Sequence, residues 1–263
     1  MRKKILLFQP CLLVAGFMGF VASTGCGKTA NWDNLNEAVR EEKLIDLKFF
    51  FERKRADVNL RDKTTGKTLV QTASHHNSGT GVLGYLLTHG GDVNAQDDNG
   101  WSALHYSAMF NHNLGITIFL IENGADIDAT CMLGDTALHK AAHHSNVDVL
   151  VYLIDRGANP NAANIFGITP LHNAAHKPSE VGLRMVKHLI AHGADINAKS
   201  DTGCTPLHLA SSGDAGVDVL GYMIAVGADI DAKNNQKKTP IDSVSSEEKR
   251  VFLFTALAVE TSL

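Results

Sequence analysis

The chain has 263 residues, of which 44% are hydrophobic and 20% charged, a composition typical of a protein that buries a sizeable core. Its formal net charge is −4 at pH 7, so it lacks the basic excess of nucleic-acid-binding domains, and no nucleic-acid partner is expected. The four cysteines do not have the paired spacing of a zinc ribbon.

The first 25 residues have the pattern of an export signal. Basic residues at positions 2–4 precede an uncharged apolar run at 5–22, and small residues lead into Cys26. This ending resembles the lipoprotein box of bacterial lipoproteins, although Ser23 stands where leucine is usual in that family. The resemblance implies that 1–25 is a signal peptide, that Cys26 is lipidated, and that the mature protein lies in the bacterial periplasm or at the cell surface, anchored to a membrane.

Two other interpretations of this segment stay open. An ordinary signal peptidase would cleave it, after Ser23 for example, and leave no lipid. Alternatively, the run at 5–22 approaches the roughly 20 apolar residues that span a bilayer, so it could remain as an uncleaved anchor.

Residues 22–29, ASTGCGKT, also fit a relaxed phosphate-loop pattern, in which backbone N–H groups and Lys28 would bind phosphates. An NTPase needs a parallel sheet around that loop and an acidic residue on a second strand to hold magnesium. The sequence after Thr29 leaves no room for them because it is filled by a repeat. We therefore expect neither nucleotide binding nor nucleotide hydrolysis.

A short motif recurs along the rest of the chain at intervals of 33 to 36 residues. It reads ADVN at 56–59, GDVN at 91–94, ADID at 125–128, ANPN at 158–161, ADIN at 194–197 and ADID at 228–231. A second motif, Thr-Pro-Leu-His in its fullest form at 169–172 and 205–208, runs in phase with it. These two features resemble the ankyrin repeat. The resemblance implies an all-α solenoid of stacked helix–turn–helix units joined by hairpin fingers.

The repeat pattern predicts five full repeats between two partial capping units. The boundaries are a tether at 26–32, a repeat domain at 33–257 and a tail at 258–263, with an N-terminal cap at 33–62, repeats at 63–97, 98–130, 131–163, 164–199 and 200–233, and a C-terminal cap at 234–257. Thr136, Thr169 and Thr205 are expected to cap the first helix of their repeats. In repeat 164–199 the segment 177–180 is expected to bulge as a loop insertion.

The 13 histidines raise the question of a metal site. His139 with His143, and His172 with His176, have the i, i+4 spacing of a zinc-binding helix, but the catalytic glutamate of such helices is absent. The ankyrin resemblance implies a structural role for the signature histidines His105, His139, His172 and His208. We predict no metal, no cofactor and no catalytic residue.

Two sets of residues are candidates for binding a partner. The resemblance places His143 and His176 on the concave groove, where unperturbed histidines would give pH-dependent binding near pH 6.5; solvated side chains without a role are the alternative. The fingertips carry apolar residues where polar ones are expected, namely Met132, Leu133, Ile165, Phe166 and Ile168, with Trp101 beside them. Such a cluster typically marks an interaction site, unless its side chains fold back on adjacent fingers.

The sequence thus predicts an exported, membrane-tethered, monomeric module that binds another protein and catalyses no reaction. The alternative is a metal- or haem-handling accessory to a periplasmic redox enzyme, acting through the histidine groove. An intracellular scaffold is a third possibility, disfavoured by the basic residues at 2–4.

Overall fold

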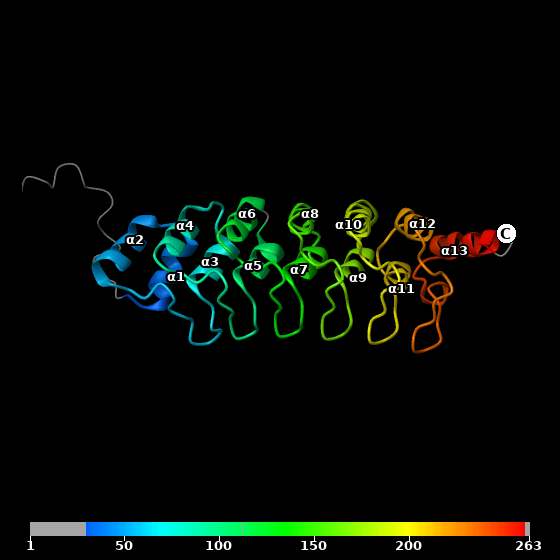
Figure 1. Ribbon diagram of the computed structural model, residues 1–263, viewed down its shortest axis with the longest axis horizontal. Helices are drawn as coiled ribbons and strands as arrows, with labels where there is room; N and C mark the ends of the chain where they lie inside the picture. The colour runs from blue at the N-terminus through cyan, green and yellow to red at the C-terminus, as the bar shows by residue number, and fades with distance from the viewer. Residues whose placement is uncertain (1–29, 112, 261–263) are drawn as a thin grey trace, which may run out of the picture.

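In the computed structural model, residues 30–111 and 113–260 are described, and they form a row of stacked helix pairs with fingers along one side (Figure 1). The helices are α1 (Trp32–Arg40), α2 (Leu44–Lys48), α3 (Leu69–His76), α4 (Gly81–Thr88), α5 (Ala103–Phe110), α6 (Leu114–Glu122), α7 (Ala137–His143), α8 (Val147–Asp155), α9 (Pro170–Ala175), α10 (Ser179–Ala191), α11 (Pro206–Ser212), α12 (Val217–Ala225) and α13 (Glu247–Glu260), with a π-helical turn η1 (Phe49–Arg53) and a 3-10 turn η2 (Ile241–Ser243). The architecture is the predicted all-α repeat solenoid. The predicted signal peptide and Cys26 lie outside the described residues.

Each first helix begins at a capping residue, as predicted. Thr136 is extended, and its hydroxyl accepts a hydrogen bond from the backbone N–H of His139, while the His139 ring accepts one from the Thr136 N–H. This reciprocal arrangement satisfies two donors that a helix start leaves free. At α9 and α11 the first helical residue is Pro170 or Pro206, where a missing N–H costs nothing.

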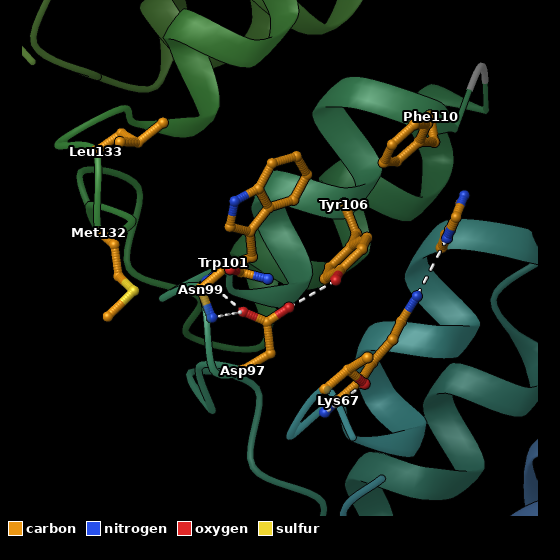
Figure 2. A pocket seen from close by; sticks show the side chains of 10 residues that line it. Lys67, Asp97, Asn99, Trp101, Tyr106, Phe110, Met132 and Leu133 are labelled. Carbon is orange, nitrogen blue, oxygen red and sulfur yellow. Dashed lines mark hydrogen bonds between the residues drawn. The ribbon is translucent and has the colours of Figure 1, made fainter. Parts of the chain in front are cut away.

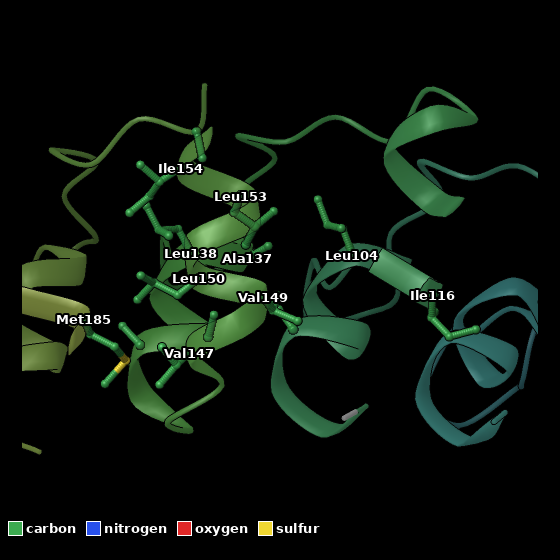
Figure 3. Close-up of a cluster of buried hydrophobic side chains, with 14 of the residues drawn as sticks. Leu104, Ile116, Ala137, Leu138, Val147, Val149, Leu150, Leu153, Ile154 and Met185 are labelled. Atoms are coloured by element: carbon green, nitrogen blue, oxygen red, sulfur yellow. The ribbon is translucent and has the colours of Figure 1, made fainter. Parts of the chain in front are cut away.

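The core runs through the whole stack as one apolar cluster between first and second helices. Figure 3 shows its middle section, where Leu138 of α7 lies beside Leu150 and Leu153 of α8. All three leucines are fully buried, and each such burial contributes about 1.5–3 kcal/mol. A single repeat would expose this face, so stacking holds the fold together.

The fingers are joined to one another by backbone hydrogen bonds between neighbouring tips. The N–H of Ile165 donates to the carbonyl of Leu133 at 3.0 Å, and the N–H of Met132 donates to the carbonyl of Asn99 at 3.0 Å. Gly100 makes this close approach possible: its φ is +74°, and a Cβ there would lie 2.8 Å from the Met132 nitrogen. The backbone of the tips is therefore fixed, while the side chains of residues at the tips are free to face solvent.

The two ends close the stack differently. At the N-terminal end α1, α2 and η1 bury Phe50. At the other end Asp242 replaces the signature histidine, and its carboxylate accepts hydrogen bonds from the N–H and hydroxyl of Thr239. The last helix, α13, continues to Glu260, past the predicted end of the domain at 257.

The prediction of a loop at 177–180 is wrong in its second half. Ser179 and Glu180 belong to α10, which has 13 residues where α8 and α12 have 9. Pro178 directly precedes this helix, and the acidic Glu180 in its first turn is stabilised by the positive end of the helix dipole. The insertion therefore lengthens a helix.

Within 30–111 and 113–260, the helices are too short or too polar to cross a bilayer.

Candidate functional site

A pocket of about 680 Å³ opens where the fingers meet the first helices α3 and α5 (Figure 2). Trp101, Tyr106 and Phe110 form one wall, and the fingertip residues Met132 and Leu133 form the other. The pocket therefore connects the apolar fingertips to the concave groove.

Packed rings build the aromatic wall. The ring centroid of Tyr106 lies 5.2 Å from that of Trp101, and Phe110 lies 6.2 Å from Trp101 and 4.3 Å from the ring of His75. Tyr106 and Phe110 are one helical turn apart on α5, so both project from the same face of that helix. The wall is rigid because each ring is held between others.

Asp97 fixes the wall from below. One carboxylate oxygen accepts hydrogen bonds from the N–H groups of Asn99 and Trp101, both at 2.9 Å, and the other accepts one from the Tyr106 hydroxyl at 2.6 Å. Burial and this hydrogen bond raise the pKa of Tyr106 above its usual value. The buried carboxylate therefore connects the finger to α5.

Two lysines flank the wall. The Lys67 ammonium lies 4.0 Å from the centre of the Tyr106 ring and 3.1 Å from Nδ1 of His75. The Lys140 ammonium lies 4.5 Å from the centre of the Trp101 ring and forms an ion pair with Asp135 at 2.8 Å. The two lysine–ring contacts are cation–π interactions. Of the two lysines, Lys67 lines the pocket itself, whereas the charge of Lys140 is paired with that of Asp135.

Burial changes the protonation of the groove. It lowers the pKa of Lys67 to about 8, because the charged form is partly desolvated. It also lowers the pKa of His75 to about 4, with the neighbouring Lys67 charge adding to the effect, and lowers the pKa of His143. For His143, the pKa is therefore below the unperturbed value near 6.5 on which the expected pH dependence rested.

The fingertips carry the exposed apolar side chains that the sequence predicted. Met132 is 71% exposed, Leu133 47%, Ile165 56% and Phe166 53%, so they do not fold back into the core. Ile168 differs: it is half-buried at the base of its finger.

The other predicted partner-binding residues lie on or beside the groove. Trp101 is half-buried in the wall, and His143 and His176 are exposed at the ends of α7 and α9. His143 stands next to His144, whose ring lies 6.2 Å from Phe110. His143 is therefore the sequence neighbour of a residue that lies beside the aromatic wall.

Sequence reasoning missed Lys67, His75, Asp97 and Tyr106 as parts of one pocket. The i, i+4 pair Tyr106 and Phe110 was the available signal, because two aromatic side chains at that spacing share a helix face.

Donor atoms suited to a metal ion converge elsewhere, on the second helices, at Asp155, His188 and His192. Neither His143 nor His176 belongs to this group.

Comparisons with known proteins agree with the repeat architecture. The family model described as "Ankyrin repeats (3 copies)" matches residues 35–131, 76–164, 113–199 and 138–234. The ankyrin repeat domain of Bcl-3, a member of the IκB family, superposes with a TM-score of 0.70 at 26% identity, covering 86% of this chain and 100% of that one. The human ASB11 ankyrin repeat domain superposes with a TM-score of 0.72 at 21% identity, covering 84% of this chain and 96% of that one.

No curated protein sequence matches the chain. Because the family model covers most of its length, the chain belongs to the ankyrin repeat family, whose domains generally bind other proteins.

Proposed function

We propose that the chain is an exported, membrane-tethered module that binds a segment of another protein through its fingertips and concave face. The pocket between α5 and the fingers carries this proposal, because its aromatic wall opens directly onto the exposed apolar tips. Polar tips at 98–99 and 201–202 flank the apolar ones, and an apolar centre with a polar rim is the usual anatomy of a protein interface.

The charge of Lys67 indicates the chemistry of the bound segment. Among the described residues, no carboxylate lies within ion-pair distance of the Lys67 ammonium, although burial already disfavours its charge. A carboxylate brought to this position would stabilise the ammonium. We therefore assign the pocket to an extended segment that carries an aromatic or branched aliphatic side chain next to acidic residues.

Export and tethering are supported by the sequence pattern at 1–26, which resembles that of bacterial lipoproteins. The module acts as a monomer, and we assign it no cofactor and no catalytic role. Its contribution is a preformed surface, so binding costs little entropy for ordering the residues of the docking site.

Handling of metal or haem through the groove histidines was the alternative function. A site for a metal ion needs ring nitrogens that converge on one point. In the described part of the chain, the set of three converging donors contains neither His143 nor His176. The groove is therefore assigned to protein binding.

Selection from a random peptide library tests this proposal, with the full-length chain held in detergent as bait. We expect enriched peptides to share an aromatic or aliphatic side chain beside Asp or Glu, and to lose binding to Trp101→Ala. Val226→Ala is the matched control, because Val226 is exposed at the C-cap of α12, outside the pocket. Absence of enrichment, or enrichment that Trp101→Ala leaves unchanged, would contradict docking here; enrichment of basic peptides would reject the acidic partner alone.

A further inference from the structure

Three metal-donor side chains meet where α8 and α10 end side by side, on the edge of the solenoid away from the fingers (Figure 1). Asp155 is the last residue of α8, and His188 and His192 lie one turn apart at the end of α10. One donor atom from each residue lies within 4.8 Å of the other two. The set contains two imidazoles and one carboxylate, which is a common ligand set for zinc.

The spacing of the donors matches a tetrahedral ion. Zinc bonds of about 2.0–2.2 Å place tetrahedral ligand atoms about 3.4 Å apart. Here Oδ1 of Asp155 lies 3.1 Å from Nε2 of His188 and 3.6 Å from Nε2 of His192. These two separations lie on either side of the ideal value, and the donor atoms of the two histidines lie within 4.8 Å of each other.

The tautomer of His192 is already the one that a metal requires. Its Nδ1 lies 2.9 Å from the backbone carbonyl of His188, and a carbonyl only accepts, so Nδ1 carries the hydrogen. In the neutral ring, Nε2 then carries a lone pair, and it faces Oδ1 of Asp155. Nε2 lies 3.6 Å from Oδ1 of Asp155, a separation at which both atoms can ligate one ion. A backbone carbonyl that orients the ligating histidine in this way is typical of metal sites.

His188 needs only a change of tautomer. Its Nε2 donates to Asp155 when no metal is bound, because the carboxylate accepts. When an ion enters, this hydrogen leaves Nε2 and the neutral ring carries its hydrogen on Nδ1.

The surroundings also favour a cation. The carbonyl ends of α8 and α10 both lie here, and a helix C-terminus carries a partial negative charge. The neighbouring basic side chains are engaged elsewhere: Arg156 lies over the ring of Tyr152, and Arg184 pairs with Asp148.

His89 shows what distinguishes this cluster from ordinary surface histidines. It is the C-cap of α4, as His192 is of α10, and its Nδ1 likewise lies 2.8 Å from the carbonyl four residues earlier. However, that residue is Tyr85, and His89 belongs to no three-donor group among the described residues. The chain therefore provides its own matched control.

We propose that Asp155, His188 and His192 form a zinc site that links repeat 131–163 to repeat 164–199. Three protein ligands leave the fourth tetrahedral position open to water or to a donor from another molecule. The ion stiffens the stack at this junction, and it does so independently of the fingertip pocket.

Zinc titration of the metal-stripped, full-length chain in detergent tests the site. By calorimetry we expect one Zn²⁺ ion per chain, and with Co²⁺ as probe we expect the visible absorption of a tetrahedral site. Removing a group that orients a ligand costs about 10–100-fold in affinity, so replacing a ligand itself in His188→Ala or His192→Ala should cost at least that. Asp155→Asn, which keeps the shape of the side chain, should also weaken binding.

His89→Ala should leave zinc binding unchanged. Zinc should also raise the thermal midpoint of the wild type and of His89→Ala but not that of the ligand variants, because binding to the folded state stabilises it. Stoichiometric binding that survives in the His188→Ala, His192→Ala double variant would overturn the proposal. So would a wild-type chain that binds no Zn²⁺, or an equal loss in His89→Ala, which would indicate unspecific surface binding.

Discussion

The Nε2–H group of His139 donates a hydrogen bond to the carbonyl oxygen of Ile168, 3.0 Å away in the next repeat. Nε2 must carry the hydrogen because Nδ1 accepts from the N–H of Thr136. The neutral ring therefore holds its own helix start and the following finger together. His105, His172 and His208 make the same pair of contacts in their repeats.

Gln71 occupies this position in the first full repeat and makes equivalent contacts. Its side-chain oxygen accepts from the N–H of Thr68, and its amide donates to the carbonyls of Ala95 and Trp101. The two hydrogen bonds, one to the helix start and one to the following finger, can thus be made by a side chain that does not titrate.

We predict that His139→Gln keeps the fold, whereas His139→Ala destabilises it. The alanine variant leaves the buried Thr136 N–H without a partner, which costs about 1–3 kcal/mol. The Ile168 carbonyl loses the His139 contact but still accepts from the N–H of Asn164. Thermal or urea unfolding measures both variants. Equal stability of His139→Ala and the wild type would show that these side-chain hydrogen bonds do not stabilise the fold.

The wild type and His139→Gln also test a pH dependence of stability. Burial lowers the pKa of His139 in the folded chain, so protons bind preferentially to the unfolded chain. The wild type should lose stability as the pH falls below about 6.5, the unperturbed value, and continue to lose it down to the folded pKa. His139→Gln should lose less over this window, measured as the thermal midpoint at each pH. An identical acid dependence in both proteins would contradict this assignment.

The repeat fold was predictable from sequence because a few residues determine each unit. Thr136 as a cap and Pro170 at the first helical position act within one turn of backbone, and the 33- to 36-residue period shows how often that turn recurs. The exception was Glu180, placed in a loop by comparison with shorter repeats. The proline before the helix and the acidic first turn are helix-start signals that the sequence already contained.

The candidate sites were less predictable because they depend on contacts between repeats. The exposed tips could be predicted because Phe166 occupies a position where a polar residue is expected. The pocket could not, because it depends on the contact between Lys67 and Tyr106 of the next repeat. The zinc cluster shows the same limit. The i, i+4 spacing of His188 and His192 is visible in the sequence, yet only the packing of α8 against α10 brings Asp155 to them.

The state of the N-terminus is a separate prediction. We expect Cys26 to carry lipid, and because only residues 27–31 separate it from α1, the solenoid would lie close to the bilayer. Acyl chains contribute about 0.8 kcal/mol per buried CH₂ group, and two chains give stable attachment. Mass spectrometry of the mature N-terminus decides it, with Cys26→Ser as the control that releases the protein. An unmodified terminus at Thr24 would exclude lipidation while leaving export in place.

The fingertip interface predicts loss of binding without loss of fold. Phe166→Ala combined with Leu133→Ala should weaken binding of the selected peptides by at least about 2 kcal/mol, or thirty-fold, if an anchor is removed. The thermal midpoint should hardly change, because substitutions at exposed side chains are usually within about 0.5 kcal/mol. Both quantities are measured on the same preparation.

Leu138→Ala is the contrasting variant. Leu138 is fully buried, so truncation should lower the free energy of unfolding by about 2–5 kcal/mol. If the double tip variant lowers the midpoint as much as Leu138→Ala does, the tips are part of the core and the interface is wrongly placed.

The acidic character of the bound segment predicts how its affinity changes with pH. Lys67 has a pKa of about 8 in the free chain, and a carboxylate bound beside it would raise that value. Binding therefore takes up a proton between the two pKa values, and affinity should fall as the pH rises above 8.

Lys67→Gln should bind at least about tenfold more weakly at pH 7, since it lacks the charge of a hydrogen-bonded ion pair. Lys67→Arg, which stays charged throughout, should bind with little change between pH 7 and 9. Calorimetry in buffers of different ionisation enthalpy measures the proton uptake directly. If the wild type binds acidic peptides equally well across this range with no proton uptake, Lys67 does not contact the ligand carboxylate.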